Sequence, residues 1–149
     1  MSGGNAVAVG LALLAGLAGS VQIAVMGSFG ERIGTLEALA FATAVQLVLT
    51  LGALLVVRQS LGGFTAGLRE PAWLWAGGLM GAFIVFTITL AAPRIGTTAA
   101  IGLIIAGQLV MGAAIDRFGL FGLERIGLGW PRLLGIVLLA AGAALSLKK

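Results

Sequence analysis

The chain has 149 residues, of which 60% are hydrophobic and only 9% are charged, and its formal net charge is +4. A soluble domain carries about 25% charged residues, so this composition excludes a water-soluble globule and predicts a membrane protein in contact with the lipid bilayer. The absence of cysteine and histidine excludes Cys and His metal sites, thiol nucleophiles and imidazole catalysis. We therefore expect no catalytic residue, no cofactor, no metal and no enzyme activity. The basic residues are dispersed between apolar runs, which argues against nucleic acid as a partner.

Five charge-poor windows follow one another along the sequence. Each predicts a transmembrane helix, because a span needs about 20 mostly apolar residues. The fifth window is short, and we expect Trp130 to anchor one end at the interface while Lys148 and Lys149 reach water from the other. The prediction is one all-α integral membrane domain over residues 1–149, in the cell inner membrane. The spans cover about 6–26, 38–57, 71–92, 97–115 and 133–147, with an interfacial loop over 116–131.

Prolines and charges mark the ends of these spans. Pro71 and Pro131 fall at helix starts, where a missing N–H costs little, and Pro93 falls where the third helix should stop. Asp116 and Arg117 mark the place where the fourth helix leaves the hydrocarbon, and we expect them to form a solvated interfacial ion pair there.

Lys and Arg residues in short loops set the orientation of a membrane protein. With five spans, one side carries five of the nine basic residues and the other carries four, which predicts insertion in both orientations. We therefore expect an antiparallel (inverted) homodimer of ten helices; a single dominant loop is the alternative. If the fifth segment did not cross, the tally would become seven against two. The first group is Arg58, Arg69, Arg117, Arg125 and Arg132, and the second is Arg32, Arg94, Lys148 and Lys149.

Glycine occurs 25 times, mostly inside the predicted spans. In lipid, small residues allow helices to approach closely, so small residues four apart are typical of helix contacts. These patterns predict packing and specify no function. The glycines that we expect at helix contacts are Gly16, Gly19, Gly77, Gly81 and Gly102.

The third span presents an aromatic and polarisable face. Three- and four-residue steps place Trp73, Met80, Phe83 and Thr87 on that face. Ligand pockets are lined mainly by apolar and aromatic groups, so these residues are candidates for a substrate site. Simple core packing or lipid contact is the alternative.

Polar side chains at membrane depth supply further candidates. Gln22 and Gln108 need hydrogen-bond partners away from water, either as the lining of a wet cavity or by bonding across helices. No carboxylate lies in the middle of a span, and the nearest are Glu37 at the start of the second helix and Asp116 at the end of the fourth. These two residues are the candidates for gating or for ion coupling.

Several motifs in the second half carry a family resemblance. Residues 77–122 contain GGLMGA, AAPRIGTTAA, IIAGQL and IDRFGLFG in this order, and WPRLLGI opens the last helix. Their order and spacing resemble the YdcZ-type family of the drug/metabolite transporter superfamily, with a more distant similarity to small multidrug resistance proteins. The resemblance implies a half-size member of five helices, whose full-length relatives contain two inverted repeats. The first half departs from the pattern: it keeps Gln22, but Met26 stands where the family often has Asn.

The leading hypothesis is a dual-topology transporter that moves a small amphipathic or cationic metabolite or drug-like solute by alternating access. Its partners would be the bilayer, a second antiparallel copy of the chain and the small-molecule substrate. Two alternatives stay open. One is a dual-topology small-ion channel, although the scattered Gln and Thr residues make no obvious ring. The other is a structural half-subunit that pairs with another membrane chain.

Overall fold

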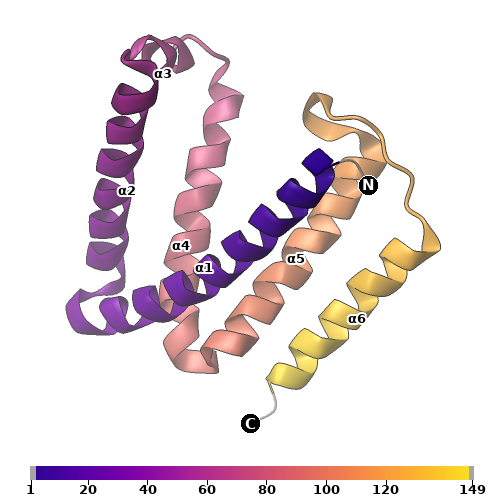
Figure 1. The fold of residues 1–149 in the computed structure, drawn as a ribbon. Coiled ribbons are helices and arrows are strands. Elements are labelled where there is room, and N and C mark those ends of the chain that lie inside the picture. Colours follow the sequence, from indigo (N-terminus) through magenta and orange to yellow (C-terminus); the bar gives the residue numbers. More distant parts are fainter. Residues whose placement is uncertain (1–2, 148–149) are drawn as a thin grey trace. The chain divides into compact units, whose positions relative to one another are not determined.

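The chain is helical over most of its length in the computed structural model, which describes residues 3–147 (Figure 1). No strand occurs within those residues, which confirms the predicted all-α fold class. The α-helices are α1 (Gly3–Ile33), α2 (Thr35–Arg58), α3 (Gly62–Gly67), α4 (Ala76–Ile95), α5 (Thr97–Phe118) and α6 (Trp130–Ser146), and the short 3-10 helices are η1 (Ala72–Trp75) and η2 (Leu120–Gly122).

Within residues 3–147, four helical stretches are long and apolar enough to cross a membrane, as predicted for the first four windows. α6 is also apolar, but its 17 residues extend only about 26 Å, against a hydrocarbon core of about 30 Å. The fifth span therefore stays a prediction, and Lys148 and Lys149, expected at its end, lie outside the described residues. The four stretches are Asn5–Ile33, Thr35–Arg58, Ala72–Ile95 and Thr97–Phe118.

Helices α1 and α5 continue past the ends of their apolar windows. α1 includes Glu31 and Arg32, and α5 includes Asp116 and Arg117, so the predicted interfacial loop is helical in its first residues. A charged side chain leaves the hydrocarbon without breaking the ladder of backbone hydrogen bonds. Pro93 likewise does not end α4, which continues for two more residues, because a proline in the last turn removes only one of those bonds.

The tetrapeptide Arg-Ile-Gly-Thr makes two of the connections between helices, at residues 32–35 and 94–97. Gly34 has φ 103° and ψ 149°, and Gly96 has φ 88° and ψ 148°, in a region that is almost exclusive to glycine. Each glycine closes one helix and opens the next, because its N–H bonds four residues back and its carbonyl accepts from four residues ahead. These bonds join Gly30, Gly34 and Ala38 in the first turn and Ala92, Gly96 and Ala100 in the second.

The chain divides into two compact units, and each has its own close contacts. In the unit made of residues 22–90, the Phe29 ring meets the Phe41 ring edge-on, with 5.6 Å between centroids. Gly30 lies directly against the Thr89 side chain, where a Cβ would not fit. The Thr89 side chain is buried, and its hydroxyl donates to a carbonyl of its own helix at 2.7 Å. A glycine and aromatic rings therefore hold α1, α2 and α4 together within this unit.

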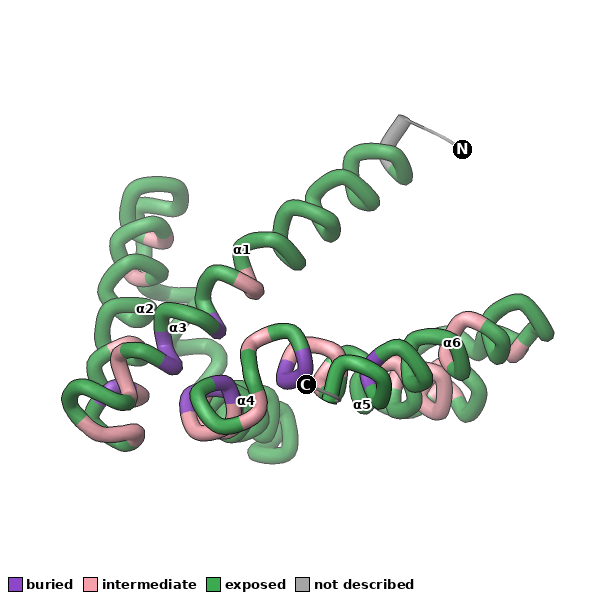
Figure 2. The backbone as a smooth tube through the Cα atoms, turned by 90° about the horizontal axis from the view of Figure 1, so that it is seen from below, coloured by how far each residue is buried: buried purple, intermediate pink, exposed green. Residues whose placement is uncertain are grey.

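In the other unit, α5 packs along α6. The helices approach closely at Gly102, where an added Cβ would lie 3.1 Å from the Cα and Cβ atoms of Ala143. Ala99, Ala100 and Ala143 are buried, so small residues set the spacing of these two helices, as expected for helices in lipid. Figure 2 shows that exposed residues predominate along most helices, which suits a chain whose outer surface contacts lipid.

Gly96→Ala should destabilise the protein through backbone strain alone. A Cβ at Gly96 would meet no atom within 4 Å, but the backbone angles there cost an L residue on the order of 1–3 kcal/mol. We expect a lower midpoint of thermal unfolding, followed by helical circular dichroism of detergent-purified protein. Gly107→Ala is the matched control, because Gly107 has equally open space inside α5 and the change gains about 1 kcal/mol of helix propensity. An unchanged midpoint for Gly96→Ala would contradict this account of the turn.

Candidate functional site

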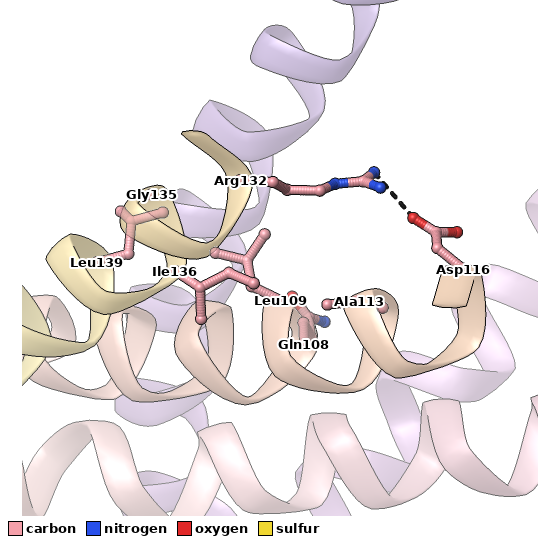
Figure 3. Close-up of a pocket in the computed structure, with 9 residues that line it drawn as sticks. Gln108, Leu109, Ala113, Asp116, Arg132, Gly135, Ile136 and Leu139 are labelled. Carbon is pink, nitrogen blue, oxygen red and sulfur yellow. Dashed lines mark ion pairs between the residues drawn. The ribbon is translucent and has the colours of Figure 1, made fainter. Parts of the chain in front are cut away.

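A groove of about 290 Å³ lies between α5 and α6 and combines apolar walls with an amide and an ion pair (Figure 3). Its volume is at the lower end of the range of about 300–1,000 Å³ typical of ligand pockets, so it suits a small ligand. The lining residues are Gln108, Leu109, Gly112, Ala113 and Asp116 of α5 and Arg132, Gly135, Ile136 and Leu139 of α6.

Three residues of α5 form a stripe along the groove, with a polar side chain at each end: Gln108, Gly112 and Asp116, each four positions from the next. This spacing places them on one face of the helix. A Cβ at Gly112 would meet no atom within 4 Å, so the stripe is open between the amide and the carboxylate. Gln108 lies near the middle of the 22 residues of α5, about 12 Å along the axis from Asp116. The groove therefore runs from the end of the span to about its middle.

Asp116 and Arg132 form an ion pair at the end of the groove, with 2.8 Å between Oδ2 and Nη2 (Figure 3). Asp116 lies in the last turn of α5 and Arg132 in the first turn of α6, so each charge has the unfavourable sign for its end of the helix dipole. Their pairing offsets both unfavourable interactions and links the two helices. The Asp116 side chain is 25% exposed and the Arg132 side chain is 45% exposed, which places the pair where water reaches it.

Asp116 pairs with Arg132 rather than with Arg117, the partner expected from the sequence. Neighbouring residues on an α-helix point about 100° apart, so Asp116 and Arg117 do not face each other. The connection after α5 instead folds back, and the Ile126 N–H donates to the Asp116 carbonyl at 2.9 Å. Within residues 3–147, Asp116–Arg132 is the one salt bridge.

The predicted aromatic face lies in the unit made of residues 22–90. Trp73 lies in η1, and Met80 and Phe83 lie in α4, each with more than half of its surface exposed. Thr87 is half-buried, and its hydroxyl donates to the Phe83 carbonyl of the same helix at 2.8 Å. The role of this face in substrate binding stays a prediction.

Gln22 and Glu37 also belong to this unit, and both are exposed. The Glu37 carboxylate lies close to Gly34 in the first turn of α2, where the helix dipole favours a negative charge. This local interaction accounts for the position of Glu37, and its role in gating stays a prediction. The grouping of Gln22 with Gln108 in one cavity also stays a prediction, because the two residues belong to different units.

The five glycines expected at helix contacts have different surroundings. Gly102 lies against Ala143, whereas a Cβ at each of the other four would meet no atom within 4 Å. These four leave open space beside their helices, and a second chain or lipid would fill it. They are Gly16, Gly19, Gly77 and Gly81.

The α6 side of the groove is not apparent from the sequence pattern taken helix by helix. Arg132, Ile136 and Leu139 follow three- and four-residue steps, which is common on any helix face. The one available signal is Arg132 itself, because a cation in the first turn of an apolar helix opposes the helix dipole. A search for a carboxylate at an equally unfavourable helix end would have found Asp116.

Long apolar helices and a groove of small-ligand size define a multi-pass helical membrane protein. The chain belongs to the YdcZ family: the family model, described as "Putative inner membrane exporter, YdcZ", matches residues 7–145. The match confirms the resemblance seen in the motifs and extends it over the first half of the chain. The protein is therefore a multi-pass protein of the inner membrane, from a family described as exporters. No curated protein and no solved structure matches the chain.

Asp116→Asn and Arg132→Gln should each lower the thermal stability, and the double variant should lose less than the sum of the two. Each single variant loses the same ion-pair attraction and leaves the other charge unpaired at an unfavourable helix end, so the sum counts that attraction twice. Partly exposed ion pairs couple by about 0.2–1 kcal/mol. A double-mutant cycle on detergent-purified protein measures this coupling. Arg117→Gln is the matched control and should not couple with Asp116→Asn. Coupling of Asp116 to Arg117 instead of Arg132 would show that the ion pair is wrongly assigned.

Gln108→Cys in liposomes should react with a small, charged thiol reagent, because the groove admits water to the middle of α5. The chain has no native cysteine, so the background is clean. Met111→Cys is the matched control: Met111 is 59% exposed on the same helix but does not line the groove, so its thiol should lie in lipid and stay unreactive. Gln22→Cys tests the second amide in the same assay. Full protection of the cysteine at position 108 would remove Gln108 from the solute site.

Proposed function

We propose that two copies of this chain, inserted in opposite orientations, form a transporter that moves a small amphipathic or cationic solute across the inner membrane by alternating access. The match to a family of inner-membrane exporters over residues 7–145 supports transport as the activity. Inverted repeats give transporters two related states, open to opposite sides of the membrane. Two identical chains of opposite orientation supply the same relation.

The observation that carries the proposal is how little of each span one copy buries. In the four long spans, between 0% and 11% of the most apolar window is buried. A path for a polar or charged solute needs protein walls through the hydrocarbon, because lipid offers polar groups no hydrogen bonds. A second copy would supply the missing walls. The open glycines on α1 and α4 are suitable contact points, because small residues allow close helix approach.

The balance of basic residues supports opposite orientations for the two copies. Five against four Lys and Arg residues, with five spans, gives insertion almost no preferred direction. This argument requires that α6 crosses the membrane. Its 17 residues lie at the lower edge of the spanning range, and the exposed Trp130 at its start is a suitable interfacial anchor.

Within each copy, we assign the solute site to the groove between α5 and α6. Its apolar walls would contact the apolar part of the solute, and the Gln108 amide would supply a hydrogen bond near the middle of the span. A positive group on the solute would compete with Arg132 for the Asp116 carboxylate. Because that ion pair links α5 to α6, its release would loosen the two helices at one end, which gives Asp116 a gating role.

Added lysines should fix the orientation of the chain, one pair in each direction. Each variant expressed alone should be inactive, and the two variants expressed together should regain activity. Gly63→Lys with Gly67→Lys should direct the N-terminal side to the cytoplasm, and Ile33→Lys with Thr98→Lys should direct it outward. A Cβ at Gly63 or Gly67 meets no atom within 4 Å, and Ile33 and Thr98 are exposed, so the side chains have room. The measurement is efflux of ethidium, a small amphipathic cation, from cells that express one or both variants.

Glutamine at the same four positions is the matched control, because it changes the side chains without adding charge and should leave efflux as in the wild type. Labelling of a C-terminal cysteine from each side of the membrane reports the orientation. If either lysine variant is fully active alone while uniformly oriented, the functional unit is parallel or monomeric and the proposal fails.

A further inference from the structure

A second hollow lies at the end of α5, separate from the groove. Its volume is about 390 Å³, and it is lined by Arg117, Phe118, Arg125, Ile126 and Gly127. Two of the nine basic residues of the chain therefore border one space. Arg117 comes from the last turn of α5, and Arg125 comes from the connection to α6.

The fold places Arg125 beside this hollow through backbone and packing contacts. α5 ends at Phe118, and the next residue, Gly119, has φ 62° and turns the chain back. The Ile126 N–H donates to the Asp116 carbonyl at 2.9 Å, which fixes the residue next to Arg125 against the helix end. The Arg125 stem lies over Gly119, where an added Cβ would be 2.7 Å from Cγ. The two guanidinium groups are therefore held near one hollow by the local fold.

The charges of these two arginines are not neutralised within residues 3–147. Asp116 is paired with Arg132, and Glu124, although adjacent to Arg125 in sequence, forms no salt bridge in this part of the chain. Two fixed cations beside one hollow repel each other, and an anion between them would replace that repulsion with attraction. Guanidinium groups form strong, charge-assisted hydrogen bonds with phosphate, often two to one arginine.

The surroundings of the hollow indicate the source of the anion. Phe118 and Ile126 line the hollow beside the arginines, and further exposed apolar side chains occur along the same segment of the chain. An arrangement of this kind is unfavourable in water but suits the boundary between headgroups and acyl chains. A phospholipid is the molecule that presents a phosphate and an apolar portion together at that boundary. The exposed side chains are Phe118, Phe121, Leu123, Ile126 and Trp130.

We propose that Arg117 and Arg125 bind the phosphate of an anionic phospholipid headgroup, while Phe118 and Ile126 contact the apolar part of the same lipid. The bound lipid would hold the connection between α5 and α6 at the membrane surface. Arg117 points about 100° from Asp116 around the helix, and the two hollows have no lining residue in common, so this site and the groove share one helix end without sharing a charge. The site requires only that this connection lies at the headgroup level, and lipid binding does not depend on transport.

The test is lipid binding to the detergent-purified chain, with phosphatidylglycerol as the probe. A ligand that binds the folded state raises the midpoint of thermal unfolding, so titration gives an apparent affinity. Arg117→Gln with Arg125→Gln should weaken that affinity about tenfold or more. The matched control is Arg58→Gln with Arg69→Gln, which removes the same charge from the end of α2 and from the connection that follows it. It should weaken the affinity less than about threefold, the part due to general attraction between basic residues and anionic lipid.

Native mass spectrometry supplies a second readout: the wild type should retain one more phosphatidylglycerol per chain than Arg117→Gln with Arg125→Gln. If that double variant does not fold, each single variant is titrated, and each should weaken binding. If the control variant loses as much affinity for phosphatidylglycerol as Arg117→Gln with Arg125→Gln, the effect is only general attraction and the proposal is overturned. An equal, arginine-dependent shift with inorganic phosphate would overturn the lipid assignment in favour of a free anion. An equal shift with phosphatidylcholine would overturn the need for an anionic headgroup.

Discussion

The hydrocarbon of the bilayer offers no hydrogen-bond partner, so each span of this chain must satisfy its backbone groups within its own helix. The two Arg-Ile-Gly-Thr turns meet this requirement with a single residue each, because Gly34 and Gly96 both donate to the preceding helix and accept from the following one. The hydroxyls of Thr43, Thr50 and Thr87 follow the same rule, since each donates to a carbonyl four residues earlier. These threonines therefore need no partner on another helix.

Charges are confined to the helix ends and the connections. At the end of α5, two consecutive charged residues have different surroundings. Asp116 and Arg117 point about 100° apart, so Asp116 lines the groove and Arg117 does not. Asp116 takes Arg132 as its partner, which holds α6 against α5 at that end. Arg117 is left beside Arg125 at a second hollow. Two chemically different surfaces thus arise from two consecutive residues.

Helix packing within one copy is sparse. Gly102 against Ala143 brings α5 and α6 together, and Gly30 against Thr89 does the same for α1 and α4. Other glycines in the spans have open space beside them, among them Gly16, Gly19, Gly77 and Gly81. Small residues without neighbours cost helix propensity and return no packing energy. Their presence is consistent with contacts that form only in an assembly, where the proposed second copy would lie against them.

The sequence by itself determined the helical membrane fold, because hydropathy and charge spacing decide which segments the bilayer accepts. It also placed Gln108, Gly112 and Asp116 on one helix face, since that relation depends only on helix geometry. The tertiary structure decided what lies opposite this face. Arg132 is 16 positions after Asp116 and reaches it only because the connection folds back from Gly119, so no local pattern identifies the pair. The repeated Arg-Ile-Gly-Thr segments are present in the sequence, but their shared hydrogen-bond pattern is visible only once the backbone angles of Gly34 and Gly96 are known.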